Sequence, residues 1–101
     1  MILLATRVAT KGRHKIYRHG AVLCRGGKVI AKACNRDVAH AEERVLAKAG
    51  PDNCIGATLY VARLGYRMSK PCPKCELAIA KAGIKKVVYT DWDCSIQIER
   101  I

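Results

Sequence analysis

The hydrophobic positions along the chain follow two spacings, one typical of helices and one typical of strands. Apolar residues three or four positions apart predict helices over residues 2–11, 39–49 and 72–83. A glycine closes each of these segments, as is common where a helix ends. Runs that are β-branched or alternate in polarity predict five strands, over residues 16–24, 28–34, 57–64, 85–90 and 95–101.

The connections between these segments predict how the strands pair. Gly26 and Gly27 supply the positive φ angles that a tight hairpin between the first two strands requires. The next two connections contain helices and should be right-handed crossovers, which makes the second, third and fourth strands parallel or nearly so. The last two strands are too close in sequence for a parallel return, so the fifth should run antiparallel. We therefore expect one α/β domain over residues 1–101, with three α/β/α layers around a five-stranded mixed sheet.

Length and composition narrow the class of protein. The chain has 101 residues, half of them apolar, which is enough for one modest core. No apolar run is long enough to span a membrane, and the N-terminal segment is too short for a signal peptide, so we expect a cytoplasmic protein. In that compartment the cysteines should not form disulfides. Four of the six stand alone and are interpreted as small buried apolar residues: Cys24, Cys34, Cys54 and Cys94.

The charge of the chain is strongly positive and unevenly distributed. The formal net charge is +11; residues 1–36 hold nine lysines or arginines and no acid, whereas the rest holds ten basic and eight acidic residues. A block of one sign is typical of proteins that attract phosphates, on a nucleotide or along a nucleic acid. It is equally typical of a solvated face that keeps a protein soluble. Charge alone therefore leaves the partner open.

Two short motifs stand at the starts of the second and third predicted helices. His40 and Glu42 are two positions apart, and Cys72 and Cys75 enclose two residues. Both helices follow strands whose carboxyl ends share one edge of the sheet, so we expect the motifs to meet in the crevice there. One nitrogen and two sulfurs fill three of the four positions of a tetrahedral zinc, which is the arrangement of catalytic zinc sites. Glu42 could then carry protons to and from the reacting group.

Each motif has a simpler interpretation on its own. A lone Cys-x-x-Cys also occurs in redox pairs and as half of a zinc ribbon, and a glutamate at a helix start often only offsets the helix dipole. However, the sequence holds no second Cys-x-x-Cys, and a redox pair leaves His40 and Glu42 unexplained. The dipole role fits Glu43 better than Glu42. The combination favours one catalytic zinc ion per chain as the cofactor.

The sequence around the two motifs resembles the cytidine deaminase superfamily of zinc-dependent nucleobase deaminases. The resemblance rests on His-Ala-Glu at residues 40–42, on Pro-Cys-Pro-Lys-Cys at residues 71–75, and on the strands before and after the second motif. It implies that His40, Cys72 and Cys75 bind zinc. It also implies that Glu42 transfers protons while cytosine is converted to uracil.

The resemblance further implies contacts with the substrate. Members of the superfamily hold the base through a backbone N–H that corresponds to Ala41, and line the base pocket at the position of Ala21. An asparagine at the end of the second strand often contacts the sugar, and Asn35 is the matching residue, although it lies only five positions before His40.

Basic residues are expected at the entrance of the crevice. Lys70 directly precedes the Pro-Cys motif, where many relatives have a small or acidic residue. Arg67 lies in the same loop and Arg36 in the loop before the second helix. If the substrate is a nucleotide, one of these three should contact its phosphate, and Lys70 is assigned to substrate binding on this ground.

The last strand bears on the branch of the superfamily. A parallel fifth strand followed by a further helix occurs in the deoxycytidylate, tRNA-adenosine and polynucleotide cytosine deaminases, whereas this chain ends with its fifth strand. The resemblance is therefore nearer to the branch with a terminal hairpin, which holds the free cytidine deaminases and some bacterial toxin deaminases.

Three functions are open at this point. The favoured one is deamination of free cytidine, deoxycytidine or their nucleotides. The second is deamination of cytosine in single-stranded DNA or RNA, held through the basic N-terminal third. The net charge supports it, but the five aromatic residues are sparse, and only Tyr66 and Trp92 fall in predicted loops. The third is a non-catalytic, zinc-stabilised binding module, for which Glu42 would have no use.

The expected partners are thus a nucleoside or nucleotide substrate and, through the basic segment, a single-stranded nucleic acid, with no membrane. A core this small also predicts a homo-oligomer, since compact relatives complete their pockets from a neighbouring subunit. A fully active monomer in a sedimentation measurement would contradict that expectation.

Overall fold

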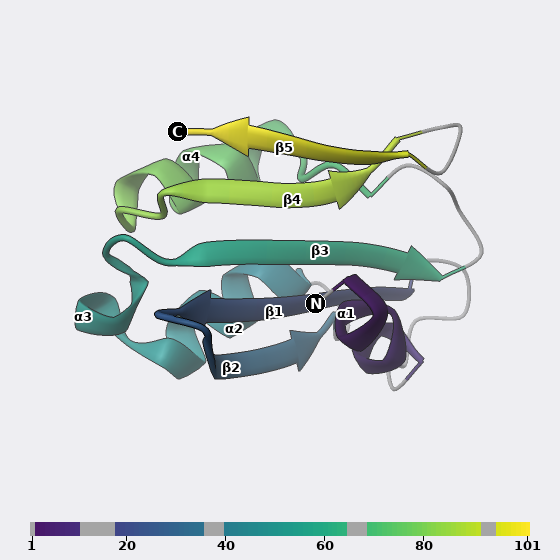
Figure 1. The fold of residues 1–101 in the computed structure, drawn as a ribbon, viewed down its shortest axis with the longest axis horizontal. Coiled ribbons are helices and arrows are strands. Elements are labelled where there is room, and N and C mark those ends of the chain that lie inside the picture. The colour runs from purple at the N-terminus through teal and green to yellow at the C-terminus, as the bar shows by residue number, and fades with distance from the viewer. Residues whose placement is uncertain (1, 11–17, 36–39, 65–68, 92–94) are drawn as a thin grey trace.

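The computed structural model describes residues 2–10, 18–35, 40–64, 69–91 and 95–101 (Figure 1). Its described helices are α1 (Ile2–Ala9), α2 (Ala41–Ala49), α3 (Pro51–Cys54) and α4 (Pro73–Lys81). Its described strands are β1 (Arg18–Arg25), β2 (Lys28–Cys34), β3 (Thr58–Leu64), β4 (Lys86–Thr90) and β5 (Ile96–Arg100). None of these helices is long and apolar enough to cross a membrane.

The five strands form one mixed sheet in the order β2-β1-β3-β4-β5. β1 is antiparallel to both β2 and β3, β3 is parallel to β4, and β5 is antiparallel to β4. The strands β2, β3 and β4 therefore run in one direction, and the last strand returns as a hairpin, as the sequence predicted. The turn between β1 and β2 holds Gly26 and Gly27 at φ angles of 60° and 78°, which confirms the predicted hairpin.

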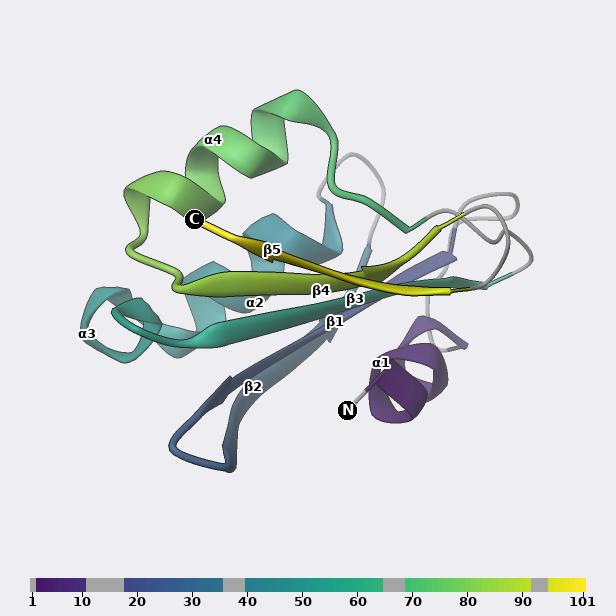
Figure 2. The ribbon, with the colours of Figure 1, turned by 45° about the horizontal axis from the view of Figure 1, so that its top comes forward.

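Helices cover both faces of this sheet (Figure 2). The larger core, which includes Leu23, Leu59 and Val45, lies between the sheet and the layer of α2 and α4. A smaller core on the opposite face joins α1 to β1 and β3, with Val8 against Val22 and neighbouring residues. Gly20 makes this possible, because a Cβ at that position would collide with the backbone of α1 at Ala5. The predicted three-layer α/β/α arrangement is confirmed.

Several boundaries differ from the predicted ones. The sequence predicted that helix formation stops at Gly50 and Pro51, but the one-turn helix α3 follows directly. Gly50 has a φ angle of 83°, which ends α2, and Pro51 occupies the first position of α3, where a proline costs no hydrogen bond.

Of the four single cysteines, Cys24 and Cys54 are buried and Cys34 is half-buried, whereas Cys94 lies outside the described residues.

Candidate active site

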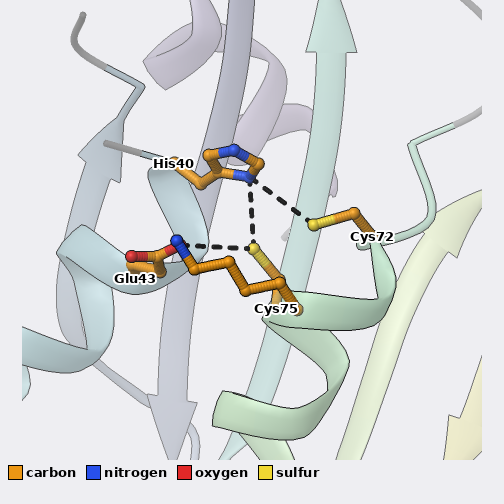
Figure 3. A network of polar contacts seen from close by, with 5 residues as sticks. His40, Glu43, Cys72 and Cys75 are labelled. Carbon is orange, nitrogen blue, oxygen red and sulfur yellow. Dashed lines mark hydrogen bonds and ion pairs between the residues drawn. The ribbon is translucent and has the colours of Figure 1, made fainter. Parts of the chain in front are cut away.

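The two motifs meet at the N-termini of α2 and α4. His40 is the N-cap residue of α2, Cys72 is the N-cap residue of α4, and Cys75 lies in the first turn of α4. The chain reaches α2 from the carboxyl end of β2 and α4 from the carboxyl end of β3, and these two strands run in the same direction. The three side chains consequently point toward one another across the gap between the two helices (Figure 3).

The distances within this cluster match a single tetrahedral zinc ion. The Nδ1 atom of His40 lies 3.2 Å from the Sγ atom of Cys75 and 3.7 Å from that of Cys72. All three ligand atoms lie within 4.8 Å of one another. Ligand atoms on one zinc, with Zn–S of about 2.3 Å and Zn–N of about 2.0 Å at tetrahedral angles, are about 3.5 Å apart. The residues therefore fit the metal that the motif implies.

The electrostatics of Cys75 also favour a cation in the cluster. This cysteine is fully buried. Burial raises the pKa of its thiol well above the ordinary value, and the nearby Glu42 carboxylate adds to the shift. A thiol must lose its proton to bind a metal, and a divalent ion reverses the pKa shift by stabilising the thiolate. The cluster is thus suited to a bound dication.

Glu42 lies beside the cluster without being one of its three ligand residues. Its side chain is only 2 % exposed, and no hydrogen-bond partner for its Oε1 atom is found among the described residues. Burial raises the pKa of this carboxyl group above that of an exposed glutamate. A buried carboxyl oxygen without a partner destabilises a fold, so its presence here indicates a role toward a bound molecule.

Glu43, one residue further on, has a different environment. It is part-exposed, its Oε1 atom lies 3.7 Å from the Nζ atom of Lys74, and the Sγ atom of Cys75 is 4.0 Å away. It stands in the first turn of α2, where a negative charge is favourable toward the helix dipole. This arrangement agrees with the interpretation of Glu43 as a residue of the helix terminus.

The three substrate-contact candidates from the resemblance occupy distinct places. Ala41 is the first residue of α2, where the helix leaves its N–H without an intrahelical acceptor. Ala21 belongs to the core on the α2 side of the sheet and is fully buried. Asn35 directly follows β2, and its Oδ1 atom accepts a hydrogen bond from the backbone N–H of His19 at 2.9 Å. The carboxamide oxygen of Asn35 therefore holds β1 and β2 together, a role that the sequence did not predict.

Lys70 has partners that the sequence did not reveal. Its Nζ atom lies 3.2 Å from a carboxylate oxygen of Glu99 in β5 and 3.7 Å from one of Glu76 in α4. These ion pairs raise the pKa of the Lys70 ammonium group, Glu99 contributing most. Lys70 thus links the last strand to the segment that carries Cys72, and its contact with a substrate phosphate stays a prediction. The other expected residues of the crevice lie outside the described residues: Arg36, Arg67, Tyr66 and Trp92.

Ser69 is a further residue of the site region that sequence reasoning missed. Its buried hydroxyl donates to the carbonyl of Val61 in β3 at 2.9 Å and accepts from the N–H of Thr90 in β4 at 2.8 Å. Its own N–H donates to the carbonyl of Thr90 at 3.0 Å. The described pairing of β3 with β4 ends at Tyr60, so the hydroxyl bridges the two strands beyond that point. Ser69 anchors the segment that leads to Cys72.

Replacing Ser69 with Ala should weaken both the fold and zinc binding. The change leaves the buried Val61 carbonyl and the part-buried Thr90 N–H without this partner, which costs about 1–3 kcal/mol of the free energy of unfolding. We expect zinc affinity, measured by competition with a chelator, to fall about tenfold because Cys72 is held less firmly. Thr6→Ala, which removes a hydroxyl from α1 on the other face, should leave zinc affinity unchanged. Equal zinc affinity in both variants would contradict the anchoring role.

Comparison with known proteins identifies the family. Residues 1–91 match the family described as the cytidine and deoxycytidylate deaminase zinc-binding region. The chain belongs to this family. Its cofactor is accordingly zinc, and the cluster of His40, Cys72 and Cys75 is the place in the described structure where the ion fits.

Individual relatives of this deaminase-family chain come from several sources. A deoxycytidylate deaminase of Mycobacterium phage D29 is 44% identical over 50 residues, which are 50% of this chain and 34% of the phage protein. The match thus spans about a third of the length of that curated relative. A solved structure from a study of A-to-I editing by tRNA deaminases at the wobble position is 32% identical. It matches 85% of this chain and 68% of its own, with a TM-score of 0.62.

A third relative supports the fold of the family member. The dCMP deaminase of cyanophage S-TIM5, in apo form, is 24% identical over 85% of this chain and 75% of its own, with a TM-score of 0.70. The relatives named here are deoxycytidylate and tRNA deaminases, whereas the antiparallel last strand pointed to the terminal-hairpin branch. β5 itself lies beyond the residues that match the family.

Proposed function

We propose that this protein hydrolyses the exocyclic amino group of cytosine, yielding uracil and ammonia, in free cytidine, deoxycytidine or their nucleotides. The observation that carries the proposal is the buried Oε1 atom of Glu42, which has no hydrogen-bond partner in the described part of the chain and lies beside three residues suited to zinc. A purely structural zinc site needs no such carboxyl group. The phage relatives, which are named as deoxycytidylate and dCMP deaminases, support the nucleotide as substrate.

The proposed roles follow from where the residues lie. His40, Cys72 and Cys75 hold one zinc ion, which when bound lowers the pKa of water and so supplies the nucleophile near neutral pH. The N–H of Ala41 donates a hydrogen bond to the base; its position at the start of α2, without an intrahelical acceptor, supports this role. Glu42 accepts a proton from the water and gives it to the ring nitrogen N3 as the water oxygen attacks C4. It then takes the remaining proton of that oxygen and gives it to the amino group, which departs as ammonia.

The environment of Glu42 suits this repeated proton transfer. An exposed glutamate releases its proton far below neutral pH and would be a weak acid catalyst in the cell. Burial raises the pKa of Glu42 toward the range in which a carboxyl group can both give and take a proton. The same burial keeps bulk water from the carboxyl group and preserves its proton for the substrate.

A second candidate is deamination of cytosine within single-stranded DNA or RNA. The tRNA deaminase relative is 32% identical over most of this chain, and the net charge of +11 exceeds what a free nucleoside requires. The basic residues of the N-terminal third, such as Arg13 and Arg18, would then contact phosphates; Arg13 lies outside the described residues. This candidate predicts binding that weakens steeply with salt.

One assay separates the two candidates. Zinc-loaded protein is incubated with cytidine, deoxycytidine, their monophosphates, and single-stranded DNA and RNA, and the loss of cytosine is followed. We expect conversion of the free nucleosides or monophosphates. Uracil that appears only in the polymers would contradict the first proposal and support the second. No conversion of any of these substrates by protein with one bound zinc would contradict both.

A further inference from the structure

The sheet face opposite the zinc cluster is only partly covered by the described helices. α1 lies over β1, β2 and β3, whereas no described helix lies over β4 and β5 on this side (Figures 1 and 2). Ile96 and Ile98 of β5 are 59 % and 60 % exposed there. This uncovered area, with Lys86, Ile98 and Arg100, and the Thr58 and Tyr60 side chains of β3 that border it are together termed the β4–β5 face below; Tyr60 is partly buried against the α1 core.

Strand register places two cations side by side on the β4–β5 face. Thr58 of β3 pairs with Lys86 of β4, and Lys86 pairs with Arg100 of β5. In the adjacent row Tyr60 pairs with Val88, which pairs with Ile98. Directly opposite residues on neighbouring strands point to the same face, with Cβ atoms about 5 Å apart. The face therefore presents a half-buried tyrosine and an exposed isoleucine next to a lysine–arginine pair.

Like charges in this position work against the fold. Directly opposite residues of the same charge destabilise a pair of strands, and Lys86 opposite Arg100 is such a pair. A second one, Arg25 opposite Lys28, closes the neighbouring hairpin. Among the described residues neither Lys86 nor Arg100 has an ion pair with an acid, and Glu99 of β5 pairs with Lys70 instead. Uncompensated repulsion at two places is expected where a bound anion supplies the compensation.

A shallow cavity lies at the same end of the sheet. It has a volume of about 210 Å³, and its lining includes Arg25, Lys85, Lys86, Thr58 and Tyr60 but no acidic residue. The guanidinium group of Arg25 is oriented by the backbone carbonyls of Asp52 and Ile55, which are neutral acceptors, so it keeps its charge for a ligand. Arg25, which lies in β1, and Lys85 and Lys86, which lie about sixty residues later in the sequence, thus line one cavity beside the Tyr60 ring.

We propose that the β4–β5 face and this cavity bind single-stranded nucleic acid. The cations Arg25, Lys85, Lys86 and Arg100 contact successive phosphates, and a base lies against Tyr60 and Ile98. The site is separate from the zinc cluster, because it lies on the other sheet face and at the amino ends of β3 and β4. The length of β3 alone, seven residues, separates the two by about 20 Å. The inference does not depend on which substrate is deaminated.

The decisive test measures binding of labelled single strands of about twelve nucleotides, oligothymidylate and oligouridylate, as a function of salt. Each neutralised phosphate on a single strand contributes about −0.7 to the slope of log K against log salt. The double variant Lys86→Gln with Arg100→Gln should therefore reduce the slope by about 1.4. The matched control is Lys48→Gln with Lys81→Gln, which removes two exposed charges from α2 and α4. An equal reduction in the control would overturn the proposal.

A second variant tests the aromatic contact. Tyr60→Leu should lower the affinity for the single strands about tenfold without changing the salt slope. Tyr60→Phe, which keeps an aromatic ring, should retain the wild-type affinity. Neither change should alter binding of heparin, a polyanion without bases. If Tyr60→Leu weakens heparin and oligonucleotide equally, the face binds anions in general and the proposal is wrong. A wild-type protein that binds neither oligonucleotide at low salt would also refute it.

Stability and activity measurements separate this site from the proposed active site. Lys86→Gln should raise the thermal unfolding midpoint, because it relieves the repulsion from Arg100, while it weakens oligonucleotide binding. Deamination of free nucleosides should be the same in the double variant and the wild type. If the wild type deaminates nucleosides but the β4–β5 face only joins two copies in sedimentation experiments, this inference fails and the proposed function stands.

Discussion

Replacing Glu42 with Gln should leave zinc bound and lower kcat for cytosine deamination by about three orders of magnitude or more. Glutamine keeps the size of the side chain but cannot take a proton from water or deliver one to the ring nitrogen and the amino group. The three side chains proposed to hold zinc are unchanged, so one metal ion per chain should still be found by elemental analysis. Glu42→Ala should lose activity to a similar degree.

The neighbouring glutamate provides a matched control for this experiment. Glu43→Gln removes the same charge one position further along α2, from a part-exposed carboxylate that contacts Lys74. We expect at most a few-fold change in kcat and an unchanged zinc content. Near-normal turnover of the Glu42→Gln variant, measured with zinc content equal to wild type, would remove Glu42 from the proton-transfer role.

Replacing Cys75 with Ala should abolish stoichiometric zinc binding and the stability that zinc confers. Only His40 and Cys72 then remain of the three ligand residues, too few for the catalytic arrangement. At a free zinc concentration of a hundred times Kd, wild-type protein gains about 2.7 kcal/mol of unfolding free energy, and the variant should gain none. The shift of the thermal midpoint on adding zinc measures this directly.

Cys54 serves as the control for Cys75. Both are buried cysteines, but Cys54 lies in α3 and forms part of the larger core. Cys54→Ala should lower stability with and without zinc by the same amount, since it leaves a small cavity and no missing ligand. A Cys75→Ala protein that retains the full zinc-dependent stabilisation would show that the ion binds elsewhere.

Much of the site could be predicted because it depends on local order along the chain. His40 and Cys72 each follow a strand and begin a helix, and parallel strands bring such helix starts to one edge of the sheet. The residues that support the site could not be found in this way. Ser69 forms hydrogen bonds with Val61 and Thr90, and Lys70 forms an ion pair with Glu99. Each of these contacts depends on which strands lie side by side, and sequence patterns do not specify this.

The β4–β5 face shows the same limit. The sequence drew attention to the basic N-terminal third, whereas in the structure Arg25 lines one cavity with Lys85 and Lys86, and Arg100 pairs with Lys86. Strand register alone places Lys86 opposite Arg100, and a shift by one residue would send the two side chains to opposite faces.

Helix α3 was not predicted for a local reason. A proline that stops one helix can also begin the next.

His40 stands before α2 and the two cysteines stand before and within α4, so a zinc ion bound by them would cross-link distant parts of the chain. A zinc ion held by His40 and Cys72 closes a loop of about 30 residues, which contains α2, α3 and β3. A covalent bond closing such a loop is worth about 3–4 kcal/mol in the chain-entropy description. Removing the ion would therefore release this constraint between the N-termini of α2 and α4. In the chain-entropy description such a cross-link would act as a disulfide does, by restricting the unfolded chain.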